Sequence, residues 1–232
     1  MSTFQKPKML SLPSQLNFFN ITINTFGIFI FLGFLFLAFI VWKEGKKDGF
    51  DEERLFDILL TASFLSVLFS RVFYAFGNSI TASAFFNQVI KIWTVGFDPL
   101  GALIGFLLPV LIFSKLWKWS FYRIADIFSM GFALAFSIVT LGFVGLQANF
   151  NFLFAFACWI FVFALLSKIR GNKFRSGYGF CLFLLLNAGL GWYFFGAGEY
   201  LIFYVSLVTL GFIVFLFRWR IANVSTTSRF IK

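Results

Sequence analysis

Long apolar runs separated by short polar segments are the feature that most constrains how this chain can fold. The runs occupy residues 18–42, 55–77, 98–114, 124–146, 150–167, 179–195 and 200–217. A helix of about 20 apolar residues crosses a hydrocarbon core, so each run is long enough, or nearly so, to span a bilayer. Only 12% of the residues are charged, about half the fraction of roughly 25% found in soluble domains. The sequence therefore predicts an all-α polytopic membrane protein with about seven transmembrane helices.

The placement of Lys and Arg predicts the orientation of these helices. Fifteen of them lie in residues 43–54, 115–123, 168–178 and 218–232, and three lie in the segments on the other side. Cytoplasmic segments of membrane proteins are enriched in Lys and Arg. We therefore expect the N-terminus outside and the C-terminus in the cytoplasm. The net charge of +10 then reflects topology and contact with anionic lipid, and we expect no nucleic-acid partner.

One membrane domain accounts for most of the chain. We expect a polar N-terminal segment at 1–17, a membrane domain of seven spans at 18–217, and a basic cytoplasmic tail at 218–232. The first apolar run is longer than the core of a signal peptide and is expected to be a retained helix. The chain has no His, and both of its Cys lie inside apolar runs. We therefore expect no metal site and no cofactor.

Arg71 is the most unusual ionisable residue, because it lies inside the second predicted span. It follows Arg54 by 17 residues, which places it roughly 25 Å from the inner surface at 1.5 Å per residue. Tyr74 and Asn78 lie on the same helix face. Such a group could bind a phospholipid phosphate through paired hydrogen bonds, or it could merely anchor the span by extending toward the interface. Both interpretations stay open.

Two acidic residues are expected at the outer boundary. Asp98 precedes Pro99 at the start of the third span, an arrangement typical of a helix N-cap but also compatible with a catalytic acid. Glu199, in the loop before the last span, has the same two interpretations. Gly101 and Gly105 form a GxxxG pair, which favours close packing against another helix.

At the inner boundary, two further acidic features are expected to stabilise helix starts. The cluster DEER at 51–54 is expected to cap the second span, and Asp126 is expected to favour the N-terminus of the fourth.

Five segments carry a resemblance to a known family. In chain order they read FGIFIFLGF, KKDGFDEERLFDILL, SRVFYAF, KIWTVGFDPLGALIG and FYRIADIFSMGFALAFSI. Their order and spacing resemble those of prolipoprotein diacylglyceryl transferase, a bacterial inner-membrane enzyme with seven spans and an outer N-terminus. The resemblance covers roughly residues 18–145. It implies a multi-pass protein of the bacterial cytoplasmic membrane.

The resemblance also implies a reaction. Enzymes of this family transfer a diacylglyceryl group from phosphatidylglycerol to the thiol of the lipobox cysteine of a prolipoprotein, and a glycerol phosphate leaves. The chemistry requires a group that deprotonates the thiol and cations that hold the phosphate. Phosphatidylglycerol and the signal peptides of prolipoproteins are therefore the expected partners.

Several polar positions of the family pattern carry other side chains here. The first-span Tyr, the His of the glycine-rich turn, and the Arg and Asn of the signature fall respectively at Phe26, Leu100, Thr140 and Phe143. Arg71, Tyr74 and Asp126 match the pattern, and Arg71, Tyr74 and Asn78 are the expected phosphate-binding residues. Asp98 and Glu199 are then the acids available for catalysis. An Asp with a pKa near 4 is, however, a weak base toward a thiol with a pKa near 8.5.

Three functions are compatible with this pattern. The first is a divergent lipid transferase that modifies prolipoproteins. The second is a noncatalytic relative, a pseudoenzyme, that still binds phospholipid or prolipoprotein. The third is a structural or transporter subunit without lipid chemistry, which would need a polar path to the middle of the membrane.

Overall fold

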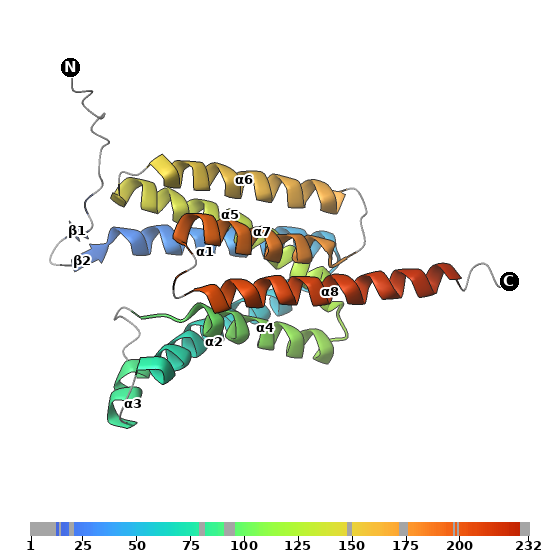
Figure 1. Cartoon of the computed structure of the whole chain (residues 1–232), viewed down its shortest axis with the longest axis horizontal. Coiled ribbons are helices and arrows are strands. Elements are labelled where there is room, and N and C mark those ends of the chain that lie inside the picture. The colour runs from blue at the N-terminus through green and yellow to red at the C-terminus, as the bar shows by residue number, and fades with distance from the viewer. Residues whose placement is uncertain are drawn as a thin grey trace, which may run out of the picture.

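The computed structural model describes residues 13, 15–18, 21–78, 82–90, 96–147, 150–171, 176–196, 198 and 200–227. Helices make up most of this structure, and a two-stranded hairpin precedes them (Figure 1). The elements are β1 (Gln15–Phe18), β2 (Ile21–Asn24), α1 (Thr25–Lys47), α2 (Glu52–Asn78), α3 (Ala82–Ile90), α4 (Pro99–Leu116), α5 (Phe121–Gln147), α6 (Phe150–Gly171), α7 (Tyr178–Phe195) and α8 (Leu201–Thr227).

Five of these helices are long and apolar enough to cross a membrane within the described residues, namely α1, α2, α4, α5 and α6. The described apolar parts of α7 and α8, Tyr178–Phe194 and Leu201–Phe217, are shorter. The prediction of a helical membrane protein is thus confirmed. The count of seven spans and the orientation of the termini stay predictions.

Helix α5 is the centre of the bundle. In its most apolar stretch 61% of the residues are buried, compared with 22–33% in the other four candidate spans. It packs between α1 and α6, while α2 pairs with α4 and α7 pairs with α8 (Figure 1). Two apolar clusters meet on α5, one shared with α1, α2 and α4 and the other with α6, α7 and α8. The other helices of the bundle therefore pack on α5, either directly or through a neighbouring helix.

The predicted start of the first span is wrong by seven residues. Residues 21–24 read ITIN, in which β-branched and polar side chains alternate, and this pattern favours a strand over a helix. Strand β2 pairs antiparallel with β1, with Phe18 opposite Ile21. Helix α1 begins only after Asn24, whose side chain accepts a hydrogen bond from the backbone N–H of Phe26 at 3.0 Å.

Two further elements depart from the predicted boundaries. Helix α3 forms inside the segment expected to be a loop between the second and third spans, and Phe85 of α3 packs against Phe76 of α2 with ring centroids 5.0 Å apart. Helix α8 continues to Thr227, well past the predicted end of the last span at residue 217.

The ends of α1 and α6 are joined by ion pairs. Arg170 lies 3.2 Å from a carboxylate oxygen of Glu44 and 2.8 Å from one of Asp48. Nearby, the side chain of Asp51 accepts a hydrogen bond from the backbone N–H of Arg54 at 3.1 Å. The predicted capping of α2 by the DEER cluster is therefore confirmed for Asp51.

Candidate functional site

The candidate site lies where the end of α2 meets the start of α4, and Arg71 is its central residue. Only 1% of Arg71 is exposed, and it is among the largest fully buried side chains in the described structure. Its Nη1 donates a hydrogen bond to the carbonyl oxygen of Gly96 at 2.7 Å. A buried cation within a membrane span needs such a partner, because the apolar surroundings do not solvate it. Arg71 therefore points into the protein and holds the turn before α4.

The turn itself depends on Gly96. Its φ of +124° lies in a region that favours glycine, and a Cβ atom added there would lie 2.4 Å from Cε1 of Tyr74. The guanidinium of Arg71 also lies over the ring of Phe97, whose centroid is 4.6 Å from the guanidinium carbon. Half of Phe97 is exposed, whereas Arg71 is buried. This ring therefore lies between the guanidinium and the protein surface.

Asp98 is the N-cap of α4, as one of its two interpretations predicted. Its Oδ1 accepts a hydrogen bond from the backbone N–H of Gly101 at 2.8 Å, and Pro99 follows at the first helical position. Two hydrogen bonds also join the backbone of Asp98 to Ser70 of α2. The backbone N–H of Asp98 donates to the carbonyl oxygen of Ser70 at 3.2 Å, and the hydroxyl of Ser70 donates to the carbonyl oxygen of Asp98 at 2.8 Å. One carboxylate oxygen is thus used for capping.

Gly101 and Gly105 bring α4 into direct contact with the backbone of α2, as the GxxxG pattern predicted. A Cβ atom at either glycine would lie 2.4 Å from a carbonyl oxygen of α2, that of Phe69 or Leu65 respectively. Alongside them the hydroxyl of Ser66 donates to the carbonyl of Ala102 at 3.0 Å. This close contact sets the position of Gly96 and Asp98 relative to Arg71.

Of the three residues expected to bind phosphate, the structure brings two to the same place. Tyr74 packs against Gly96, the residue whose carbonyl receives the Arg71 hydrogen bond. The Asn78 side chain is exposed, and its Nδ2 donates to the carbonyl of Tyr74, one turn earlier in the same helix, at 2.9 Å. Asn78 thus helps to end α2, whereas Arg71 and Tyr74 surround the turn.

The substituted family positions form a second group, mostly on α1 and α5. The rings of Phe26 and Phe143 are in contact, with centroids 4.6 Å apart, and Phe143 also stacks on Phe152 of α6 at 5.2 Å. The hydroxyl of Thr140 is buried and lies 2.9 and 2.8 Å from carbonyl oxygens of its own helix. Leu100 lies apart from them, half-buried in the first turn of α4. Aromatic packing therefore joins α1 to α5 at Phe26 and Phe143.

Glu199, the other candidate acid, lies outside the described residues. Among the described residues, no group of three His, Cys, Asp or Glu side chains is placed to hold a metal ion.

Asp126 has a role that the sequence did not predict. Its carboxylate accepts hydrogen bonds from the backbone N–H groups of Gly177 and Phe180, at 2.5 and 2.7 Å. These groups belong to the start of α7, whose own N-cap is a glycine without a capping side chain. Asp126 therefore supplies the cap from a neighbouring helix and fixes α7 against α5.

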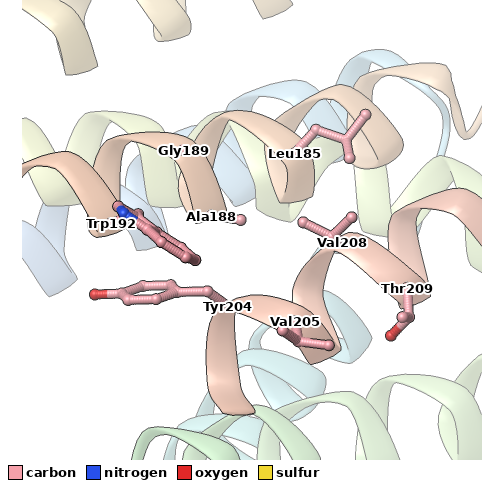
Figure 2. A pocket seen from close by; sticks show the side chains of 8 residues that line it. All are labelled: Leu185, Ala188, Gly189, Trp192, Tyr204, Val205, Val208 and Thr209. Atoms are coloured by element: carbon pink, nitrogen blue, oxygen red, sulfur yellow. The ribbon is translucent and has the colours of Figure 1, made fainter. Parts of the chain in front are cut away.

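A groove of about 370 Å³ runs between α7 and α8 and is lined mainly by apolar side chains. Figure 2 shows the rings of Trp192 and Tyr204 facing each other at one end, with Leu185 and Val208 toward the other. The groove is separate from the Arg71 site, which is formed by α2 and α4.

Comparison with known proteins identifies similar sequences. The family model described as prolipoprotein diacylglyceryl transferase matches residues 13–193. A protein from Listeria monocytogenes serotype 4a, named phosphatidylglycerol–prolipoprotein diacylglyceryl transferase, is 27% identical over 123 residues, which cover 53% of this chain and 44% of that protein. Proteins of the same name from Bacillus licheniformis and Oceanobacillus iheyensis are 32% and 30% identical, each over 46% of this chain and over 40% and 38% of their own lengths. The matched part thus spans less than half of these relatives.

Proposed function

The chain belongs to the prolipoprotein diacylglyceryl transferase family, and on this basis we propose that it transfers a diacylglyceryl group from phosphatidylglycerol to a cysteine thiol of a prolipoprotein. In this reaction the thiolate sulfur forms a bond to the glyceryl carbon, the bond from that carbon to the phosphate oxygen breaks, and glycerol phosphate leaves. The protein lies in the bacterial cytoplasmic membrane, with α7 and α8 as the sixth and seventh spans and the N-terminus outside.

The buried Arg71 is the observation that carries this proposal. A guanidinium is permanently charged, and its planar donors match the oxygens of a phosphate. Keeping it in a membrane span is costly, which favours a role in binding an anionic group. Phe97 lies over the guanidinium and is half-exposed. Displacement of this ring would open the guanidinium to the phosphate of a lipid, and Arg71 would then stabilise the charge that develops on the leaving group.

The proton of the thiol needs an acceptor, and the candidates are Asp98 and Glu199. One oxygen of Asp98 caps α4, which leaves the second oxygen for this role. Asp98 lies only two residues after Gly96, whose carbonyl binds Arg71. An acceptor here would therefore be close to the proposed phosphate site.

A second candidate function is a noncatalytic relative that binds phospholipid or prolipoprotein. The contact between Phe26 and Phe143 favours it, because two aromatic rings occupy positions where the family resemblance implies a Tyr and an Asn. Such a protein would keep the lipid-binding surface and lose the transfer step. A transporter subunit is less favoured, because the hydroxyls of Ser66 and Ser137 donate to backbone carbonyls instead of lining a polar path.

Lipidation of a prolipoprotein in a bacterium depleted of its own transferase tests the proposal. Cells would express the unsubstituted chain, Arg71→Ala, Arg71→Lys or the control Arg54→Ala, and a gel shift would follow lipidation. Arg54 is a suitable control because it lies on the same helix and is exposed. We expect Arg71→Ala to lower the rate by about 10²–10³-fold, Arg71→Lys to lower it less, and Arg54→Ala to leave it unchanged.

The outcomes separate the two candidate functions. Equal lipidation with Arg71→Ala and with the unsubstituted chain would exclude Arg71 as the phosphate-binding group. Absence of lipidation by an inserted, unsubstituted chain would exclude the transferase function. In that case phosphatidylglycerol should still raise the melting temperature of the purified protein more than a neutral lipid does, and no difference between the lipids would exclude the noncatalytic alternative as well.

A further inference from the structure

The groove between α7 and α8 has a shape and polarity that the proposed reaction does not explain. Its floor contains Ala188 and Tyr204, which are 4% and 5% exposed, and its rims contain exposed residues such as Val205 and Val208. From Trp192 to Leu185 it extends over seven residues of α7, or about 10 Å at 1.5 Å per residue. The lining residues Trp192, Val205 and Val208 are exposed on the protein surface, so in a membrane-spanning pair of helices the groove is accessible to lipid.

The two ends of the groove differ in polarity. Figure 2 shows the indole nitrogen of Trp192 and the hydroxyl of Tyr204 at the same end, which is the end nearest the connection between the two helices. The ring centroids are 6.4 Å apart. Tyr204 as a whole is buried, but its hydroxyl is not among the buried atoms without a hydrogen-bond partner in the described structure, so this polar group is accessible from the groove while the ring packs against the helices. The groove therefore has hydrogen-bond donors at the membrane boundary and apolar side chains farther in.

We propose that this groove binds one acyl chain of a membrane glycerolipid, with the ester group at Trp192 and Tyr204 and the hydrocarbon along Leu185 and Val208. Acyl esters are the only part of such a lipid that combines hydrogen-bond acceptors with a long apolar chain, which is the order of groups along the groove. Trp and Tyr are also enriched at the depth of the bilayer where these esters lie. The lipid is a resident one and is distinct from the phosphatidylglycerol consumed at Arg71.

Gly189 provides the test, because it lies in the wall of the groove and a Cβ atom added there would meet nothing within 4 Å. Leucine at this position would extend into the groove from a Cβ atom that meets no protein atom within 4 Å. Gly27 of α1 is a matched control, since it is also an exposed helical glycine with nothing within 4 Å of an added Cβ. Gly189→Ala is a second control, because one methyl group leaves most of the groove open.

The experiment is native mass spectrometry of the purified full-length chain, released from nanodiscs that contain phosphatidylglycerol and phosphatidylethanolamine of defined acyl chains. Beyond any phosphatidylglycerol bound at Arg71, we expect one retained lipid of glycerolipid mass in the unsubstituted chain, in Gly27→Leu and in Gly189→Ala. In Gly189→Leu its occupancy should fall at least about tenfold, the effect of losing roughly two buried methylene groups. Val208→Phe fills the groove from α8 and should have the same effect.

The contrary results are equally specific. Equal lipid retention in all five proteins would overturn the proposal, and so would a parallel loss in Gly27→Leu, which would show that any added leucine loosens the bundle. Retention of only a free fatty acid or detergent mass would exclude the ester-binding role of Trp192 and Tyr204. These results do not depend on lipid transfer, so they separate failure of this proposal from failure of the proposed function.

Discussion

The glycines at the contact between α2 and α4 allow a quantitative prediction. Alanine at Gly101 or Gly105 would place a Cβ atom 2.4 Å from a backbone carbonyl oxygen of α2, whereas ordinary van der Waals contact begins at 3.4 Å. Because neither partner is a flexible side-chain end, α4 has to move away from α2 by about 1 Å, the difference between those distances. We expect each substitution to lower the free energy of unfolding by about 1–3 kcal/mol.

Gly27→Ala is the matched control for this prediction. Gly27 and Gly101 are each the third residue of their helices, but an added Cβ at Gly27 meets nothing within 4 Å. The intrinsic gain of about 1 kcal/mol from Gly to Ala in a helix applies to both. The difference in the free energy of unfolding between Gly101→Ala and Gly27→Ala therefore measures the cost of separating α4 from α2.

The double variant tests the mechanism more sharply. One movement of α4 relieves the contacts of both alanines, because Leu65 and Phe69 lie on successive turns of the same helix. The double substitution should thus lower the free energy of unfolding by about as much as the more destabilising single substitution, and by clearly less than the sum of the two single effects. The assay is reversible unfolding in mixed micelles with increasing dodecyl sulfate, followed by circular dichroism. The reasoning would be refuted if the effects of the two single substitutions on the free energy of unfolding added up in the double variant. It would also be refuted if Gly101→Ala and Gly27→Ala were equally stable.

Three further variants test other contacts. Asp126→Ala removes the acceptor for two amides of α7 and should lower the free energy of unfolding by about 0.5–2 kcal/mol, as measured in the same micelle titration; an unchanged value would contradict the capping role. Arg170→Ala breaks the pairs with Glu44 and Asp48 and should cost about 1 kcal/mol, less at high salt; a cost independent of salt would argue against an electrostatic origin. Phe97→Ala uncovers Arg71 and should enlarge the rise in melting temperature caused by phosphatidylglycerol; a smaller rise would show that the ring helps to bind the lipid.

The sequence predicts the elements that depend on simple patterns. The apolar runs locate the starts of α2 and α4–α8 within three residues, but not the start of α1 or the end of α8, and Asp98 followed by Pro99 predicts the start of α4. The close packing of Gly101 against another helix follows from the GxxxG pair, although the pair does not identify α2 as the partner. Each of these depends on neighbouring residues or on one helix surface, which a single sequence displays directly.

The features that sequence reasoning missed depend on contacts between distant segments. Asp126 caps α7 across 51 residues of chain, and nothing near Asp126 in the sequence identifies its partner. The contact of Phe26 with Phe143 likewise joins α1 to α5. The hairpin had a local signal in the alternation of ITIN, but the longer apolar run that follows concealed it.

The capping of α7 by Asp126 also has a consequence for the order of events during synthesis. Gly177, whose amide binds the carboxylate, is made 51 residues after Asp126. At about 5–20 residues per second this interval lasts roughly 3–10 s. During that time the carboxylate of Asp126 lacks the two backbone N–H groups of α7 that it binds in the folded protein. Asp126 is thus present before α7 is made, and its carboxylate is the acceptor that fixes the start of α7 once this helix packs against α5.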